Sequence, residues 1–485
     1  MRLGRGMWFA LTIAVSEAGC ATVPRASLKP EAAALPPTLD EVLAKIDRDV
    51  AAEVKAKRWP DLAIGIVYDG KLSWWRGYGE VDPVSHAPVT DETCFRYGSI
   101  TKTVTGLALL QLRDAGKLSL DDPLEKFIPE VKGVVYPTAE RPPIRLRDLV
   151  THASGLPRAP AGLDYAKRTP SEADLLVVLP GLKLDGTPGV HDEYSNYASC
   201  LEGVVIHRAS EMPYEDWIRT RIAEPLGLGF RWTEESVPSG RLAMGHTLGP
   251  KEKGNPIIEV PHSWVMGACN SCGGLYGSLD DLAKYAAFEL SGWPPRTAPE
   301  NPVASRATLR ESQQWHSREY GVNWRVEQDP KLGKVVSHGG LVAGYTAQIQ
   351  MVPDRGFAVV GLLGFDSGWE DLDHLVKVSL ADLGTVFPRL APELRLQLGR
   401  LLPLLDPGSG DVPEGLFTND FTDLLKMFDL MRQHGGNCRV VDVLSAGTYW
   451  AEINLECERG ALHLKVSVEA SPPHSIDGFW FWFPR

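Results

Sequence analysis

The sequence predicts an α+β fold, in which an antiparallel sheet is covered by helices. Near each end of the segment from residue 62 to residue 363, two neighbouring runs of alternating or continuous apolar residues have the composition of a β-hairpin. The four expected strands are Leu62–Tyr68, Leu72–Gly79, Tyr345–Val352 and Phe357–Leu363. The turns between them are Asp69-Gly70 and Pro353-Asp354-Arg355-Gly356. Since strands stand at both ends with helices between them, one sheet built from both ends is expected.

Two helices are predicted in the first part of the chain. Residues 39 to 57 form one, just before the first hairpin. The run Ser99–Ala115 is apolar on most faces and is followed by Gly116, a common helix terminator. A helix that is apolar all round is buried, so this second helix is expected in the core.

Composition excludes some classes of function. The chain has 485 residues, 44% of them hydrophobic, and a formal net charge of -12. These values are typical of a globular protein with a sizeable core. A nucleic-acid partner is not expected, because binding a polyanion requires clustered Lys and Arg.

The N-terminus has the order of an export signal. Arg2 and Arg5 precede an apolar stretch from Met7 to Val15, which is too short to span a bilayer, and small residues lead to Cys20. The end of this segment resembles a lipoprotein cleavage site, with Cys20 as the lipidated residue and Glu17 as a departure. Simple secretion and a buried segment are the alternatives. Export to the periplasm or cell envelope, with membrane contact only through this anchor, is expected.

The remaining chain divides by composition. The expected parts are a signal at 1–20, a Pro- and Ala-rich linker at 21–38, a catalytic domain at 39–385, a linker at 386–410 and a small α+β domain at 411–485. The last domain is expected to contain a helix near 420–433 and strands at 450–456 and 461–468.

Cysteine spacing favours disulfides or structural roles over a metal site. Setting Cys20 aside leaves six cysteines, an even number that an oxidising compartment can pair. Cys438 and Cys457 lie in one segment and are the expected bridge. Cys269-x-x-Cys272 has no second pair at zinc-ligand spacing, so a structural role or a disulfide is expected there.

Three short segments carry the candidate chemistry. Ser99-Ile100-Thr101-Lys102 opens the buried helix, so that Ser99 and Lys102, one turn apart, face the same way. A desolvated lysine can take the serine proton as a neutral amine. Tyr194-Ser195-Asn196 supplies a phenol for proton transfer and an amide for a substrate carbonyl. In Ser337-His338-Gly339-Gly340-Leu341, glycines leave backbone N–H groups open to an oxyanion.

These three segments, in this order, resemble the serine β-lactamase and penicillin-binding-protein superfamily, in particular its class C-like branch with related esterases and DD-peptidases. Further segments from about residue 40 to 385 resemble the family as well. They are Asp121-Asp122-Pro123, Leu149 to Pro157, Gly273 to Ser278, Asp281-Leu282 and Tyr320 to Trp324. The resemblance implies the serine β-lactamase/DD-peptidase fold, an antiparallel sheet flanked by helices with an all-helical subdomain.

The resemblance also implies roles. Ser99 is the nucleophile, Lys102 and Tyr194 handle the protons, Asn196 contacts the substrate, and the N–H groups of Ser99 and Leu341 form the oxyanion hole. No metal or organic cofactor is implied.

Two positions depart from the family pattern. His338-Gly339-Gly340 replaces Lys-Thr-Gly, so that a cation and a hydroxyl that help to bind a substrate carboxylate are missing. His338 is left open between a packing residue and a substrate contact. Asp192 stands where the family usually has an aromatic residue.

The predicted function is hydrolysis of an ester, a β-lactam or a D-amino-acid peptide through an acyl-enzyme on Ser99. The partner is therefore a small-molecule or peptidoglycan-type substrate. The alternative is a cell-envelope binding or sensing protein that keeps the fold with little or no turnover, which the altered His-Gly-Gly segment and the additional C-terminal domain suggest. Fold alone does not choose between these substrates.

Overall fold

The computed structural model describes residues 37–159, 169–260, 265–293 and 300–387, together with four strands between residues 438 and 482. The predicted signal segment 1–20 with Cys20, nearly all of the linker 21–38, and the linker 386–410 after Phe387 lie outside these residues.

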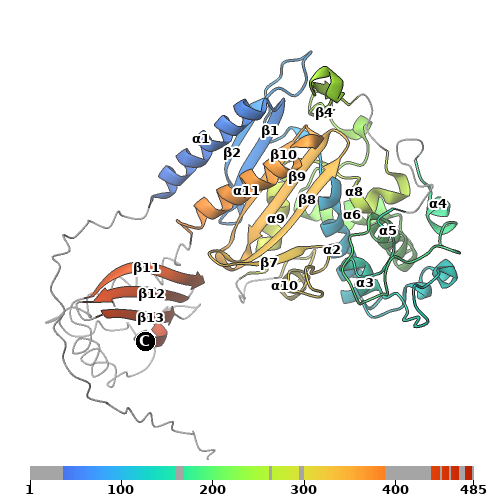
Figure 1. The fold of residues 1–485 in the computed structure, drawn as a ribbon. Helices are drawn as coiled ribbons and strands as arrows, with labels where there is room; N and C mark the ends of the chain where they lie inside the picture. The colour runs from blue at the N-terminus through green and yellow to red at the C-terminus, as the bar shows by residue number, and fades with distance from the viewer. Residues whose placement is uncertain are drawn as a thin grey trace, which may run out of the picture. The chain divides into compact units, whose positions relative to one another are not determined.

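A six-stranded antiparallel sheet, built from strands between residues 61 and 363, lies between helices (Figure 1). Its strand order is β2-β1-β10-β9-β8-β7. The strands are β1 (Asp61–Tyr68), β2 (Lys71–Gly79), β7 (Arg325–Asp329), β8 (Gly333–Val342), β9 (Tyr345–Val352) and β10 (Phe357–Leu363). Both predicted hairpins are present, and they meet where β1 pairs with β10, with Ala63 opposite Leu362. The prediction of one sheet built from both ends is confirmed.

Helices cover both faces of this sheet. On one face, α1 (Leu39–Lys57) and α11 (Trp369–Leu383) pack on strand residues such as Ile64 and Val359 in one apolar cluster. On the other face, α9 (Leu279–Leu290) packs on β1 and β10. Strand β1 is therefore buried over seven of its eight residues, as expected for a strand with both faces covered.

A mainly helical region adjoins the sheet and carries the first two predicted segments. Its helices are α2 (Thr101–Asp114), α3 (Leu146–Val150), α4 (Glu172–Leu176), α5 (Asn196–Ser210), α6 (Tyr214–Ile218), α7 (Glu224–Leu226), α8 (Asn270–Gly273) and α10 (Arg306–Ser312). Two short strand pairs accompany them, β3 (Cys94–Arg96) with β6 (Tyr276–Ser278) and β4 (His246–Leu248) with β5 (Ile257–Glu259). In α2 every residue from Thr101 to Leu110 is buried, because α5, α6 and α8 pack around it.

Local sequence explains where these elements begin and end. The side chain of Thr38 accepts a hydrogen bond from the Glu41 N–H, and the Glu41 carboxylate accepts from the Thr38 N–H, which caps α1. Asp69 and Gly70 both have positive φ, as the tight turn between β1 and β2 requires. Gly116 has φ 70° and follows the end of α2.

The described part of the C-terminal region is a four-stranded antiparallel sheet in the order β11-β12-β13-β14. Its strands are β11 (Cys438–Gly447), β12 (Trp450–Cys457), β13 (Gly460–Val468) and β14 (Ile476–Trp482). The helix expected near 420–433 lies outside the described residues. The strand register sets Cys438 opposite Cys457, and Cys457 is disulfide-bonded.

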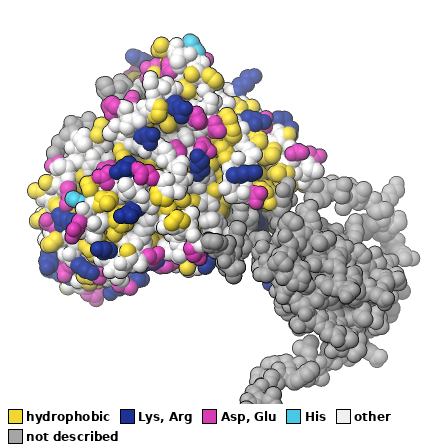
Figure 2. Space-filling model, turned by 180° about the vertical axis from the view of Figure 1, so that it is seen from behind, with side chains coloured by type: hydrophobic (Ala, Val, Ile, Leu, Met, Phe, Trp, Pro, Cys, Tyr) yellow, Lys and Arg dark blue, Asp and Glu magenta, His cyan; other side chains and the backbone are white. Residues whose placement is uncertain are grey.

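Surface charge is mixed on the face that Figure 2 shows, where Lys and Arg side chains alternate with Asp and Glu. Among the helices that the structure describes, none is both long and apolar enough to cross a membrane.

Candidate active site

Ser99 and Lys102 meet at the start of the buried helix. Lys102 Nζ lies 3.0 Å from Ser99 Oγ and donates a second hydrogen bond, 2.5 Å long, to the carbonyl of Cys272. The Lys102 side chain is fully buried. The α-helix was expected to begin at Ser99, but it begins at Thr101, and Ser99 lies in a 3-10 turn, Gly98–Ile100. Gly98 has φ 51°, a conformation that favours glycine, and this turn sets the Ser99 side chain toward the cavity.

Lys102 is held without an ion pair among the described residues, and a buried amide and carboxyl lie behind it. Asn323 Nδ2 donates to the carbonyl oxygen of Lys102 at 2.9 Å and to Glu202 Oε2 at 2.7 Å. Glu202 is fully buried, and burial raises its pKa to about 8, partly offset by the Asn323 hydrogen bond and by the charge of Lys102. Glu202 therefore stays protonated at neutral pH.

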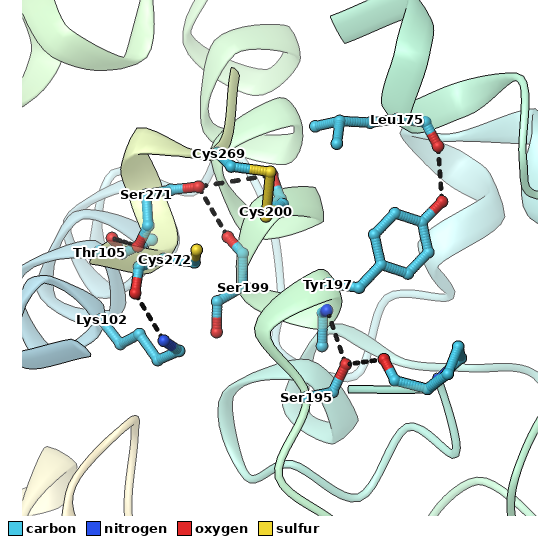
Figure 3. Close-up of a disulfide and its surroundings, with 12 residues drawn as sticks. Lys102, Thr105, Leu175, Ser195, Tyr197, Ser199, Cys200, Cys269, Ser271 and Cys272 are labelled. Carbon is cyan, nitrogen blue, oxygen red and sulfur yellow. Dashed lines mark hydrogen bonds between the residues drawn. A yellow bond between two sulfur atoms is a disulfide. The ribbon is translucent and has the colours of Figure 1, made fainter. Parts of the chain in front are cut away.

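A disulfide fixes the segment that supplies the Cys272 carbonyl (Figure 3). Cys200 in α5 is bonded to Cys269, which directly precedes α8. Next to it, Ser271 Oγ donates to the carbonyl of Ser199 at 2.8 Å. The bridge is thus not within Cys269-x-x-Cys272, because the Cys272 thiol is free and buried. Within the described residues no group of His, Cys, Asp and Glu has the arrangement of a metal site.

Tyr194 lies beside two cations. Lys102 Nζ and the guanidinium carbon of Arg158 each lie 5.1 Å from the centre of the Tyr194 ring. The His152 ring packs on Tyr194 with a centroid distance of 4.3 Å. Sequence reasoning gave Arg158 no role, because nothing in its surroundings in the chain marks it as a site residue. The phenol thus shares one site with the Ser99 and Lys102 pair.

The segment after Tyr194 opens α5. Ser195 is the N-cap, and its side chain accepts from the Ala198 N–H. Asn196 follows as the first helical residue, lines the cavity, and has a buried Oδ1 with no hydrogen-bond partner among the described residues. This unpaired amide oxygen is free to accept a hydrogen bond from a bound molecule.

Asp192 has a structural partner. Its carboxylate accepts from Ser317 Oγ at 2.8 Å and from the Glu319 N–H at 3.1 Å. These bonds hold the loop that carries Tyr320, whose ring meets the His152 ring edge-on. The unusual aspartate therefore joins two walls of the site.

His338 is neutral and presents an unpaired nitrogen. Burial, and then the charge of Lys102, lower its pKa to about 3. Its Nδ1 lies 2.7 Å from the Gly339 carbonyl oxygen and donates to it, so Nε2 is the acceptor. Nε2 is buried without a partner in the part of the chain that the structure describes. His152 is neutral too, since burial and Lys102 hold its pKa well below the usual range.

Glycines let β8 approach the nucleophile closely. A side chain at Gly340 would overlap the Tyr97 carbonyl oxygen, and its Cβ would lie 3.3 Å from the Ser99 nitrogen. A Cβ at Gly98 would lie 2.8 Å from the Leu341 nitrogen. The backbone nitrogens of Ser99 and Leu341 therefore lie at one junction, which is where the sequence predicts an oxyanion hole.

A cavity of about 600 Å³ joins these groups. Its lining includes Ser99, Tyr194, Asn196, His338 and Leu341. The cavity continues along the α11 side of the sheet, past Trp369 and Gln348 to Ala381. The structure thus brings the three predicted segments together in one site. Lys102, which is buried, and Gly340 both lie against Ser99.

Comparisons with known proteins agree with this arrangement. The Beta-lactamase family model matches residues 46–374. Beta-lactamase-like protein 2 of Dictyostelium discoideum is 29% identical over 413 residues, covering 80% of this chain and 72% of the relative. Protein flp of Staphylococcus aureus is 24% identical over 328 residues and is matched over 63% of its own length, just under two thirds, and over 67% of this chain.

Two solved structures share the fold. The octameric penicillin-binding protein homologue of Pyrococcus abyssi has a TM-score of 0.57 at 21% identity, covering 88% of this chain and 96% of that one. The D-alanine carboxypeptidase AmpC of Burkholderia cenocepacia has a TM-score of 0.57 at 20% identity, covering 71% of this chain and 99% of that one. Because the family model matches more than half of this chain, the chain belongs to the β-lactamase family.

Proposed function

We propose that this protein is a serine hydrolase that forms an acyl-enzyme on Ser99. The observation that carries the proposal is the 3.0 Å contact between Ser99 Oγ and the amine of Lys102, a fully buried lysine without a carboxylate partner among the described residues. Because this amine lies within hydrogen-bonding distance of the hydroxyl, it can accept the serine proton as the oxygen attacks a carbonyl.

The proposed reaction begins when Ser99 Oγ attacks the substrate carbonyl and its proton passes to Lys102. The carbonyl oxygen becomes an oxyanion between the N–H groups of Ser99 and Leu341. As the bond to the leaving group breaks, Tyr194 delivers a proton to the departing oxygen or nitrogen and recovers one from Lys102. Water then attacks the acyl-enzyme by the reverse proton path and restores Ser99.

Among the candidate substrates, we favour an uncharged ester over a β-lactam or a peptide with a free carboxylate. His338 supports this choice, because a neutral imidazole with a bare acceptor nitrogen offers no positive charge to a carboxylate. One of the solved structures with this fold is named a D-alanine carboxypeptidase, so hydrolysis of a D-Ala-D-Ala peptide should be tested beside the esters.

Purified protein should be treated with a fluorophosphonate and assayed with p-nitrophenyl acetate, a chromogenic cephalosporin and a D-Ala-D-Ala peptide. We expect a mass increase on the peptide containing Ser99 and ester turnover that is lost in Ser99→Ala. A folded wild-type protein with neither labelling nor turnover would instead support the alternative, a cell-envelope binding or sensing protein.

We also propose that the protein is exported and anchored through a lipid on Cys20. The basic, apolar and small-residue order of residues 2 to 20 supports this proposal. Metabolic labelling with a fatty acid should mark the full-length protein and not Cys20→Ser. Label that persists in Cys20→Ser would contradict the assignment.

A further inference from the structure

Gly339, on strand β8, makes room for a tryptophan at the start of helix α11. A side chain at Gly339 would overlap the indole ring of Trp369, the first residue of α11. The Cβ of such a side chain would also lie 2.9 Å from Gln348 Nε2. Trp369 and Gln348 therefore adjoin the same point beside β8, and a residue larger than glycine cannot share it with the indole.

Trp369 and Leu341 give this part of the cavity an apolar wall. Residues 339 and 341 are two positions apart on β8 and so point to the same face of the sheet. Leu341 is 52% exposed, an unusual exposure for a leucine in a central sheet, and both Leu341 and Trp369 line the cavity that contains Ser99. An exposed leucine and an indole that line one cavity are suited to an apolar group of a bound molecule.

Four charged side chains that line the cavity beyond this wall form two ion pairs, whereas Arg158 lines it beside Tyr194. Along α11, Asp373 follows Trp369 by one turn and bonds Lys377 at 2.7 Å. On β7, Arg325 bonds Glu327 at 2.8 Å. On these two elements each cation that lines the cavity is thus paired with a carboxylate, which weakens its attraction for an anionic group at the wall.

Gln348 explains what the indole covers. Gln348 lies on strand β9 and is only 2% exposed. Its Nε2 is buried and has no hydrogen-bond partner among the described residues. Without the indole, this donor would face the vacated volume beside Gly339. An exposed amide donor attracts an oxygen atom. By covering this amide, the Trp369 indole therefore keeps the surface apolar that would otherwise be polar.

From these contacts we propose that Leu341 and Trp369 form a subsite for an uncharged apolar group of the substrate, and that the Gly339–Trp369 pair determines this specificity. The proposal rests on the proposed hydrolase function, since it concerns the same cavity. It assigns the substrate class as esters with an apolar group next to the scissile bond, on either the acyl or the alcohol side.

The test compares substrates that differ only in charge. On the acyl side, p-nitrophenyl butyrate is paired with mono-p-nitrophenyl succinate. On the alcohol side, phenyl acetate is paired with 3-carboxyphenyl acetate. The wild-type enzyme should prefer the apolar member of at least one pair by about 10- to 100-fold in kcat/KM, the range typical of an apolar pocket. Trp369→Ala should reduce that preference by about tenfold or more, because it removes the wall and uncovers Gln348.

Trp74→Ala is the matched control. Trp74 lies on β2, at the opposite edge of the same sheet, and packs into the cluster under α1 and α11. It should lower stability without changing either substrate ratio. Ratios that are the same in the wild type and in Trp369→Ala would overturn the subsite. A wild type that hydrolyses none of the esters would instead contradict the proposed function itself.

A second set of variants tests the contact by stability. Gly339→Thr should lower the melting temperature, because its side chain overlaps the indole. Adding Trp369→Ala should restore much of that loss and leave p-nitrophenyl acetate turnover measurable. If Gly339→Thr is as stable as the wild type, or if the second substitution brings no recovery, the proposed pairing of Gly339 with Trp369 is wrong.

Discussion

Asn323 donates one hydrogen bond to the carboxyl of Glu202 and another to the main-chain carbonyl of Lys102. Asn323 is fully buried and has φ 55°, a backbone conformation that asparagine tolerates better than most residues. A protonated carboxyl, an amide and the turn that carries the lysine are thus one connected unit. Removing any member leaves a buried polar group without its partner.

Glu202→Gln should change how stability depends on pH. Burial raises the folded-state pKa of Glu202 from 4.5 to about 8, so the folded protein keeps a proton that the unfolded chain loses between these values. Its contribution is therefore fully present below pH 4.5 and is lost as the pH rises toward 8. Denaturant unfolding at pH 5 and pH 8 should show a smaller loss of stability in Glu202→Gln than in the wild type.

Glu289→Gln is the control for this prediction. Glu289 is buried, accepts a hydrogen bond from the side-chain amide of Gln313, and has a pKa raised by burial to about 7. It lies in α9, and the causes of its raised pKa do not include the charge of Lys102, which acts on Glu202. Both substitutions should flatten the pH dependence of stability, and only Glu202→Gln should alter kcat. Equal effects on kcat would remove the connection between Glu202 and the site.

Lys102→Ala should reduce acylation by about 10²- to 10⁴-fold, the usual contribution of a general base. The reason is that Lys102 is the amine within hydrogen-bonding distance of Ser99 Oγ. Stopped-flow measurement of p-nitrophenol release gives the acylation rate, and circular dichroism checks folding. Lys126→Ala, a surface substitution of the same type at an ion pair with Asp122, is the control. Wild-type acylation by Lys102→Ala would exclude this lysine as the base.

The sequence predicted those parts of the fold and site that short-range patterns encode. Asp69-Gly70 and Gly356 mark the two hairpins because tight turns need positive φ. The three-residue spacing sets Lys102 one helical turn after Ser99. Contacts between distant segments left no such pattern. Glu202 occupies an ordinary helix position, and Trp369 meets Gly339 only after α11 packs on the sheet. Nothing in the spacing of Cys200 and Cys269 distinguishes their bridge from other pairings.

His338→Gln should make the protein less sensitive to acid. Burial lowers the folded-state pKa of His338 from 6.5 to about 3, so below pH 6.5 the unfolded chain gains a proton that the folded protein does not. The wild type therefore loses stability as the pH falls from 6.5 toward 3. Glutamine has no such titration, and unfolding at pH 7 and pH 4.5 should show a smaller loss for His338→Gln. A loss as large as that of the wild type would mean that the imidazole is already charged in the folded protein.

Breaking the Cys200–Cys269 bridge should lower both stability and activity. The bridge closes a loop across 69 residues, for which a loss of about 2–4 kcal/mol on removal is typical. Because Cys269 precedes the segment whose Cys272 carbonyl accepts from Lys102, a loosened segment should also lower kcat for p-nitrophenyl acetate. The comparison is Cys200→Ser/Cys269→Ser against Cys94→Ser, which removes a buried free thiol. A double variant with lower stability but unchanged kcat at a temperature where it is fully folded would show that the bridge supports the fold without positioning the lysine.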